Sequence, residues 1–248
     1  MIPTLALIGY GEAARAFVDG GLAARVAYDI DPAKREAIAA CGGIAEAVSG
    51  CDLVLSLVTA DQALAAAQSV AAYIEPNTLY CDMNSVAPDS KRAAAVAIEA
   101  AGGRYVDVAV IAPVHPTKLA VPLLVSGPHS DAGAAALRAA GFSEVRVIGG
   151  DVGLASSIKM IRSVMIKGIE ALTAEMMLGA RGAGVADEVL ASLGDDWAVK
   201  AVYNLERMTT HGSRRAAEME EVAATLSALG VEPIMTRGTI LRQRAMAA

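Results

Sequence analysis

The chain has 248 residues, 54% of them hydrophobic, and a formal net charge of −6 at neutral pH. This length suits one large domain or two modest ones. The acidic balance argues against a nucleic-acid-binding surface, and charges interrupt each long apolar run within about a dozen residues, so no membrane span is predicted.

The three cysteines, Cys41, Cys51 and Cys81, are odd in number and lack CxxC spacing. This pattern predicts buried thiols in a reducing compartment, with neither disulfides nor a metal site. The first residues show no basic region leading into an apolar signal core, so we expect a cytoplasmic protein.

The first thirty residues carry a glycine-rich turn. The apolar run Leu5–Ile8 predicts a strand, and Gly-Tyr-Gly-Glu-Ala-Ala follows it before an expected helix over 12–18. The first glycine permits a tight turn, the second lets the backbone approach a pyrophosphate, and the last alanine lets helix and strand pack closely. Phosphate would bind the amides at the helix N-terminus, although a purely structural turn is the alternative. The predicted cofactor contacts here are Gly9, Tyr10, Gly11, Glu12 and Ala13.

Asp29 closes the next apolar run, about twenty positions further on. Dinucleotide-binding folds place an acidic ribose ligand at this point. Its carboxylate would accept hydrogen bonds from a ribose and repel a 2′-phosphate, which favours NAD over NADP. Lys34 and Arg35 keep NADP open, because either cation could bind that phosphate.

Short apolar runs alternate with helical stretches up to residue 150. Besides the first, the expected strands are Arg25–Tyr28, Leu53–Leu57, Thr78–Cys81, Arg104–Val108, Leu123–Ser126 and Glu144–Val147. The expected helices between them are Pro32–Ala40, Gln62–Ala72, Pro88–Ala101 and Ala132–Ala140. The alternation predicts an α/β, Rossmann-type, doubly wound and mostly parallel sheet.

Beyond residue 150 only helical periodicity remains, so we expect a dinucleotide-binding domain over 1–150 and an all-helical domain over 151–248. Helix breaks are expected at Gly179–Gly184, Gly194–Asp196, Gly212 and Gly230–Pro233. The helical part is small for an independent core. We therefore expect it to pack on the first domain and to form a homodimer.

The helix beginning near Val152 carries two apolar stripes and a polar strip between them. One stripe is Leu154, Ile158, Ile161, Met165, Ile169 and Leu172, and the other is Met160, Val164 and Ala171. The polar strip is Lys159, Ser163, Lys167 and Glu170. This predicts a buried helix whose polar strip faces a cleft or paired charges. In a purely structural alternative, Lys159 or Lys167 forms an ion pair with Glu170 or extends its amine into solvent.

Five features follow one another along the chain: the glycine-rich turn, Asp29, the segment Cys81-Asp-Met-Asn-Ser-Val86, Asp107 and Lys159. Their order resembles that of the β-hydroxyacid dehydrogenase superfamily. That superfamily includes 3-hydroxyisobutyrate and 6-phosphogluconate dehydrogenases. The tail from His211 onward is similar to a less characterised helical domain found attached to such NAD-binding domains. The resemblance implies an NAD(P)-dependent oxidoreductase acting on a small molecule.

The resemblance also implies roles for particular residues. Lys159 would hydrogen-bond the substrate hydroxyl and act as general acid/base, since desolvation can lower the pKa of a lysine toward neutrality. Asn84 and Ser85 would lie between substrate and nicotinamide, and Val58 and Thr59 would pass over the cofactor. The alternatives are a structural lysine and a helix-capping role for Ser85.

Two departures from the superfamily concern the substrate. Ser163 stands where an asparagine is usual, and Ile111-Ala-Pro113 replaces the carboxylate-binding Ser-Gly-Gly. Proline removes an amide donor and isoleucine removes a hydroxyl, which puts a short 3-hydroxy acid in doubt. An imine or bulky-carbonyl reductase, and a non-catalytic NAD(P)-binding sensor or scaffold, are the alternative functions. The remaining candidate substrate contacts are Ile111, His115 and His211.

Overall fold

The computed structural model describes residues 2–35 and 41–247. These residues form two compact units, of which the first ends at Lys159 and the second begins at Met160. The expected helix Pro32–Ala40 is present as α2, Pro32–Arg35, and residues 36–40 lie outside the described residues.

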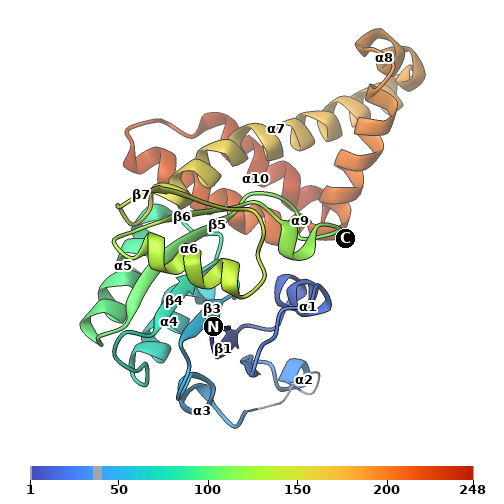
Figure 1. The fold of residues 1–248 in the computed structure, drawn as a ribbon. Coiled ribbons are helices and arrows are strands. Elements are labelled where there is room, and N and C mark those ends of the chain that lie inside the picture. The colour runs from blue at the N-terminus through green and yellow to red at the C-terminus, as the bar shows by residue number, and fades with distance from the viewer. Residues whose placement is uncertain (1, 36–40, 248) are drawn as a thin grey trace. The chain divides into compact units, whose positions relative to one another are not determined.

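Within these described ranges, seven strands form one sheet in the order β2-β1-β3-β4-β5-β6-β7. The strands are β1 (Leu5–Ile8), β2 (Val26–Tyr28), β3 (Leu53–Ser56), β4 (Leu79–Asp82), β5 (Arg104–Val110), β6 (Leu123–Ser126) and β7 (Val145–Gly149). All neighbouring pairs are parallel except β5–β6, which is antiparallel. The mostly parallel α/β sheet followed by a helical unit confirms the predicted fold class (Figure 1).

Helices cover both faces of the sheet, which is why its strands are apolar throughout. The helices of the first unit are α1 (Glu12–Asp19), α2, α3 (Ile44–Val48), α4 (Ala63–Ala71), α5 (Pro88–Ala100) and α6 (Ser130–Ala139). Leu7 packs with Phe17 of α1 and Leu137 of α6 on one face. Ala6, next to it in the strand, belongs to the core on the opposite face, which includes Ile98 of α5. The five-residue helix α3 was not predicted, because it is too short for its periodicity to stand out.

The second unit is helical. It contains most of α7 (Leu154–Ala183), with α8 (Ala186–Leu193), α9 (Trp197–Ala228) and α10 (Ile234–Met246). The expected breaks at Gly194–Asp196 and Gly230–Pro233 fall between helices, but α7 runs on to Ala183 and α9 passes unbroken through Gly212. The predicted break at Gly212 is therefore wrong. A Cβ on Gly212 would lie 2.6 Å from the Gln243 carbonyl oxygen, so this glycine allows α9 and α10 to approach closely.

The two apolar stripes of α7 have different surroundings. Met160 is buried with Met219 of α9 and Ile240 of α10. The other stripe is exposed, with Met165 at 65% and Leu172 at 57% relative accessibility. The expectation that both sides of α7 are buried is thus wrong within this chain.

The polar strip of α7 forms ion pairs, as expected, but not within the helix. Lys167 Nζ lies 2.6 Å from Glu218 Oε2 on α9. Glu170 is bound by the Arg215 guanidinium and accepts a hydrogen bond of 3.2 Å from Gln243 Nε2. Lys167 therefore does not use Glu170 as its partner, because α9 supplies nearer charges of both signs.

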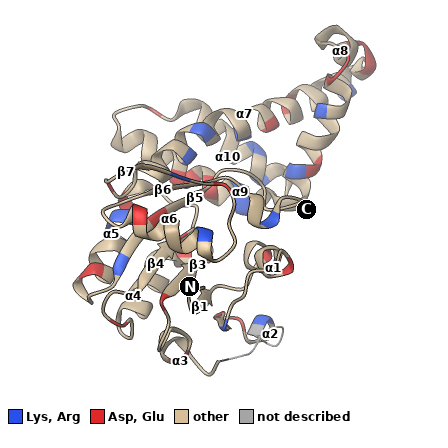
Figure 2. Ribbon diagram, in the orientation of Figure 1, with Lys and Arg blue, Asp and Glu red and all other residues tan. Residues whose placement is uncertain are grey.

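Lys and Arg are interspersed with Asp and Glu along α7 and α9, whereas the charged residues of α10 are all arginines (Figure 2). Among the described residues, none of the helices has the length and apolar character needed to cross a membrane.

Candidate active site

The glycine-rich turn joins β1 to α1. Gly9 has φ +91°, and a Cβ there would lie 2.5 Å from the Leu57 carbonyl oxygen, so only glycine fits. A Cβ on Gly11, in contrast, would meet no described heavy atom within 4 Å. Gly11 is also the N-cap residue of α1, and this position provides no side-chain hydrogen bond to the helix. The backbone at the start of α1 therefore faces open space. An anionic group could approach the amides there, where the helix dipole favours negative charge.

Asp29 immediately follows β2 and is 7% exposed. Its Oδ2 accepts a 2.7 Å hydrogen bond from the Tyr10 amide, and its Oδ1 accepts one of 2.9 Å from the Asp31 amide. Lys34 Nζ lies 3.9 Å from Oδ1. The carboxylate is thus fixed beside the turn, at the carboxyl end of a parallel strand. The strand order reverses between the neighbouring β1 and β3, where such sheets bind ligands.

Asn84 joins the loops that follow β3 and β4. Its Oδ1 accepts a 2.7 Å hydrogen bond from the Val58 amide, and its Nδ2 donates one of 3.0 Å to Ser56 Oγ. The Asn84 amide donates to Asp82 Oδ1 at 2.9 Å. Thr59 then precedes a short 3-10 turn, Ala60–Gln62. Both polar ends of the Asn84 side chain are therefore used to fix these loops.

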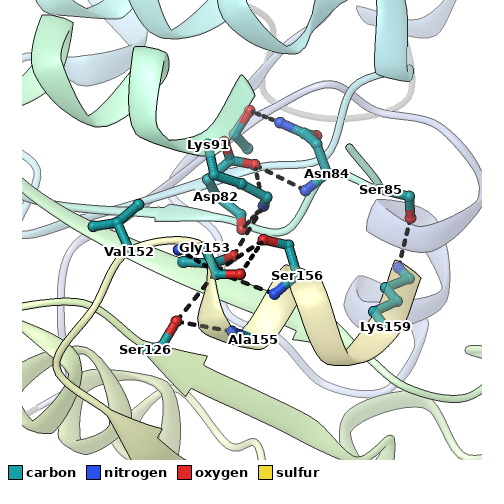
Figure 3. Close-up of polar contacts among 12 residues, drawn as sticks. Asp82, Asn84, Ser85, Lys91, Ser126, Val152, Gly153, Ala155, Ser156 and Lys159 are labelled. Atoms are coloured by element: carbon teal, nitrogen blue, oxygen red, sulfur yellow. Dashed lines mark hydrogen bonds and ion pairs between the residues drawn. The ribbon is translucent and has the colours of Figure 1, made fainter. Parts of the chain in front are cut away.

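Ser85 and Lys159 lie in contact although 74 residues separate them in the sequence. Lys159 Nζ is 2.5 Å from Ser85 Oγ, and both side chains are half-buried (Figure 3). The helix α5 begins at Pro88 and its N-cap is Ala87, so Ser85 is not a helix cap. The predicted loop serine and the predicted helix lysine thus form one polar pair.

A row of buried polar side chains crosses the sheet beside this pair. Ser56, Asp82, Asp107 and Ser126 are paired in register on four adjacent strands, β3 to β6, and each is 0% exposed. Lys91 of α5 lies over the row with its Nζ 2.9 Å from Asp82 Oδ1 and 3.5 Å from Asp107 Oδ1. The signal for this row in the sequence is a polar residue in each otherwise apolar strand, and of the four only Asp82 and Asp107 contributed to the resemblance.

Asp107 accepts hydrogen bonds from the first turn of α7. Its Oδ2 lies 3.1 Å from the amides of Gly153 and Ser156 and from the Ser156 hydroxyl (Figure 3). A carboxylate at this place satisfies amides that have no partner within the helix, and it complements the helix dipole. Ser126 supports the same turn by accepting a 3.0 Å hydrogen bond from the Ala155 amide.

Tyr105 completes the buried cluster by donating a 2.8 Å hydrogen bond to Asp82 Oδ2. Burial, together with the charges of Asp82 and Asp107, raises the pKa of Tyr105 well above its ordinary value. The phenol is therefore a hydrogen-bond donor across the whole physiological pH range.

Comparison with known proteins identifies both parts of the chain. Residues 14–136 match the NAD binding domain of 6-phosphogluconate dehydrogenase, and residues 180–246 match a domain of unknown function, DUF1932. A conserved hypothetical protein from Sinorhizobium meliloti is 39% identical, with a TM-score of 0.75 over 99% of this chain and 88% of that one. The chain thus combines an NAD-binding domain of the 6-phosphogluconate dehydrogenase kind with a DUF1932 domain, and its structural neighbours include β-hydroxyacid dehydrogenases.

More distant solved structures share the fold. A 3-hydroxyisobutyrate dehydrogenase from Salmonella typhimurium is 20% identical, with a TM-score of 0.78 over 98% of this chain and 93% of that one. A reductive aminase from Aspergillus terreus, in complex with NADPH and ethyl levulinate, is also 20% identical. Its TM-score is 0.65, covering 99% of this chain and 94% of that one.

The loop at residues 111–113, predicted to contact substrate, differs from the Ser-Gly-Gly pattern of the dehydrogenases that the sequence resembles. The Ile111 amide donates a 3.0 Å hydrogen bond to the Pro122 carbonyl, and Pro113 has no amide to donate. Ile111 itself packs against an apolar cluster that includes Ala155 of α7. His115 is exposed, whereas Ser163 and His211 belong to the second unit, on α7 and α9. Their predicted contacts with substrate stay predictions.

Proposed function

We propose that this chain is an NAD(P)-dependent oxidoreductase that transfers hydride between nicotinamide and a hydroxy acid or a related carbonyl compound. The observation that carries the proposal is the 2.5 Å contact between Lys159 Nζ and Ser85 Oγ. Ser85 directly follows Asn84, which fixes the loops after β3 and β4 at the carboxyl edge of the NAD-binding sheet. A lysine held at that edge is placed to exchange a proton with a substrate bound beside nicotinamide.

The cofactor would occupy the turn and the edge beside it. Open space at Gly11, the strict need for glycine at position 9 and the fixed Asp29 carboxylate all fit a dinucleotide. The expected contacts are Gly9, Tyr10, Gly11, Glu12, Ala13, Asp29, Val58, Thr59 and Asn84. Bound nicotinamide supplies a hydride acceptor or donor.

The protein supplies the proton chemistry. In alcohol oxidation, neutral Lys159 takes the hydroxyl proton while the carbinol C–H bond breaks, and the resulting ammonium stabilises the developing carbonyl oxygen. In reduction, the same ammonium returns the proton. Ser85 accepts a hydrogen bond from the amine and holds it in place. Ser163, one turn further along α7, would offer a second hydrogen bond to the substrate.

The altered loop favours a substrate other than a short 3-hydroxy acid. With the Ile111 amide bound to Pro122 and no amide on Pro113, this loop offers few donors for a carboxylate. An imine or a bulky carbonyl compound would need fewer of them, and the reductive aminase with the same fold acts within that chemistry. We therefore keep imine or bulky-carbonyl reduction as the second candidate activity.

The direct test is turnover by the full chain. Hydroxy acids, ketones and imines would be assayed with NAD(H) and NADP(H), using wild type, Lys159→Ala and, as a matched control, Lys118→Ala. Lys118 Nζ donates a hydrogen bond to the Asp19 carbonyl oxygen at 3.0 Å. We expect Lys159→Ala to lower kcat by about 10²- to 10⁴-fold, the usual contribution of a general acid/base, while cofactor affinity stays within about twofold.

Unchanged turnover in Lys159→Ala would remove this residue from the mechanism. Tight cofactor binding without turnover of any of these substrates would instead support a non-catalytic sensor or scaffold.

A further inference from the structure

A buried ion cluster of Lys91, Asp82 and Asp107 links the two segments that form the Lys159–Ser85 pair. Lys91 Nζ is 0% exposed and lies 2.6 Å from the Asp82 carbonyl oxygen, 2.9 Å from Asp82 Oδ1 and 3.5 Å from Asp107 Oδ1. The ammonium donates hydrogen bonds to these two Asp82 oxygens and forms an ion pair with Asp107 Oδ1. One cation thus holds two carboxylates from adjacent strands.

The first carboxylate holds the loop that carries Ser85. Asp82 Oδ1 accepts the Asn84 amide at 2.9 Å, and Oδ2 accepts the Tyr105 hydroxyl at 2.8 Å. Both carboxylate oxygens of Asp82 therefore accept hydrogen bonds, and Lys91 also binds Oδ1. These contacts fix the conformation of the backbone between Asp82 and Ser85.

The second carboxylate holds the helix that carries Lys159. Asp107 Oδ2 is 3.1 Å from the Gly153 amide and from both the amide and hydroxyl of Ser156. Lys159 is one helical turn beyond Ser156. A rigid helix transmits any shift of this first turn directly to the lysine.

We propose that Lys91 is a positioning residue that sets the Lys159–Ser85 contact by bridging Asp82 and Asp107. Lys91 touches neither member of that pair. It acts because its ammonium joins the carboxylate that orients the serine loop to the carboxylate that seats the lysine helix (Figure 3). The Asp107 Oδ1 atom is buried and has no hydrogen-bond partner among the described atoms, so the Lys91 charge is its main compensation. This inference deepens the proposed function and rests on it for its catalytic meaning.

The test follows the reactivity of the Lys159 amine, without cofactor or substrate. Trace acetylation by an N-hydroxysuccinimide ester, quantified for each lysine by peptide mass spectrometry, compares wild type with Lys91→Met and Lys91→Arg. Release of the amine from Ser85 should raise its labelling rate at least threefold in Lys91→Met. The retained charge of Lys91→Arg should restore a rate nearer to wild type. Lys34, which is partly exposed, serves as the internal reference rate.

A second pair of variants controls for a general loosening of the helix start. Ser156→Ala removes a hydroxyl that donates to Asp107 and also contacts the Gly153 carbonyl, whereas Ser157→Ala removes a neighbouring hydroxyl that donates to the Gly153 carbonyl. We expect labelling of Lys159 to rise about twofold in Ser156→Ala and to stay at the wild-type rate in Ser157→Ala. If Lys91→Met does not fold, Lys91→Arg and this pair decide the question.

Wild-type labelling of Lys159 in Lys91→Met, or in Ser156→Ala if Lys91→Met does not fold, overturns the positioning role. An equal rise in Ser156→Ala and Ser157→Ala does so as well. Because labelling requires no turnover, an inactive wild-type enzyme would refute the proposed function and leave this result intact.

Discussion

Asp29 uses both carboxylate oxygens to accept backbone amides, so its charge stays at the edge of the sheet next to the turn. A 2′-phosphate on a bound dinucleotide would meet that charge, whereas a ribose hydroxyl could donate to it. Lys34 offers only partial compensation, because it is 3.9 Å from Asp29, 3.7 Å from Asp31 and partly exposed to screening solvent.

Replacing Asp29 should therefore change cofactor preference. We expect Asp29→Ser to shift the ratio of NADP to NAD affinity at least about tenfold toward NADP, equivalent to about 1.4 kcal/mol. Calorimetric titration of both cofactors measures the ratio, and Asp31→Ser is the matched control, since it removes an exposed neighbouring carboxylate. Tighter binding of NADP than NAD by the wild type would contradict the argument.

At the scale of elements, Gly212 shows how tertiary contact overrides local preference. Glycine weakens an isolated helix by about 1 kcal/mol relative to alanine, and this led to the wrong prediction of a break in α9. The helix instead continues because the missing side chain admits the α10 backbone, with the Gln243 carbonyl oxygen 2.6 Å from the Cβ position. The contact is between backbones and cannot relax through a rotamer change.

Gly212→Ala should destabilise the protein by about 1–3 kcal/mol, the usual result of overpacking, despite its better helix propensity. Gly179→Ala is the control, because it lies in α7 and a Cβ there meets nothing within 4 Å. That variant should be neutral or stabilised by about 0.5–1 kcal/mol. Urea unfolding of both variants measures the difference, and equal midpoints would show that the α9–α10 approach is not tight.

At the scale of the whole molecule, the uncovered apolar stripe of α7 supports the expected homodimer. Ile161, Met165 and Leu172 are 48%, 65% and 57% exposed along one side of a long helix. Contiguous apolar surface of this kind usually marks an interface. The predicted assembly joins helical units through this stripe.

A charge placed in the stripe should separate the subunits. We expect Met165→Glu with Leu172→Glu to lower the mass measured by light scattering from dimer to monomer. Val96→Glu, at an equally exposed apolar position of α5, should leave it unchanged. A wild-type chain that is monomeric at micromolar concentration would exclude this assembly.

The free energy of unfolding should fall at alkaline pH because the buried Cys81 thiol and Tyr105 phenol stay neutral in the folded state. Burial raises the pKa of Cys81 from 9.0 to about 12, with a smaller contribution from Asp82, and Tyr105 shifts in the same direction. A raised folded-state pKa means that this stability is complete below pH 9 and is lost as pH rises toward 12. Each pH unit in that interval should cost about 1.4 kcal/mol for Cys81.

Unfolding free energies measured by urea between pH 8 and 11 check this expectation. In Cys81→Ala the decline should be shallower by about one proton, although its stability at pH 8 is lower because of the lost packing. An identical decline in both proteins would mean that the Cys81 thiol ionises equally well in the folded state.

Features with local physical causes could be predicted from the amino-acid order alone. Gly9, Gly11 and Asp29 follow from turn geometry and strand spacing, and the alternation of apolar strands with helices determined the layered sheet. Lys159 was identified through a resemblance, since a single lysine in a polar strip has several physical explanations.

Features that require distant chain segments to meet became visible in the folded chain. The register of four strands aligned Ser56, Asp82, Asp107 and Ser126, and α5 brought Lys91 to them. The same packing decided that α9 continues through Gly212 and that one stripe of α7 is left exposed. Local periodicity predicts which side of a helix or strand is apolar. Whether that side is buried, and which ion pairs form, depends on the elements that pack against it, and these contacts exist only in the folded chain.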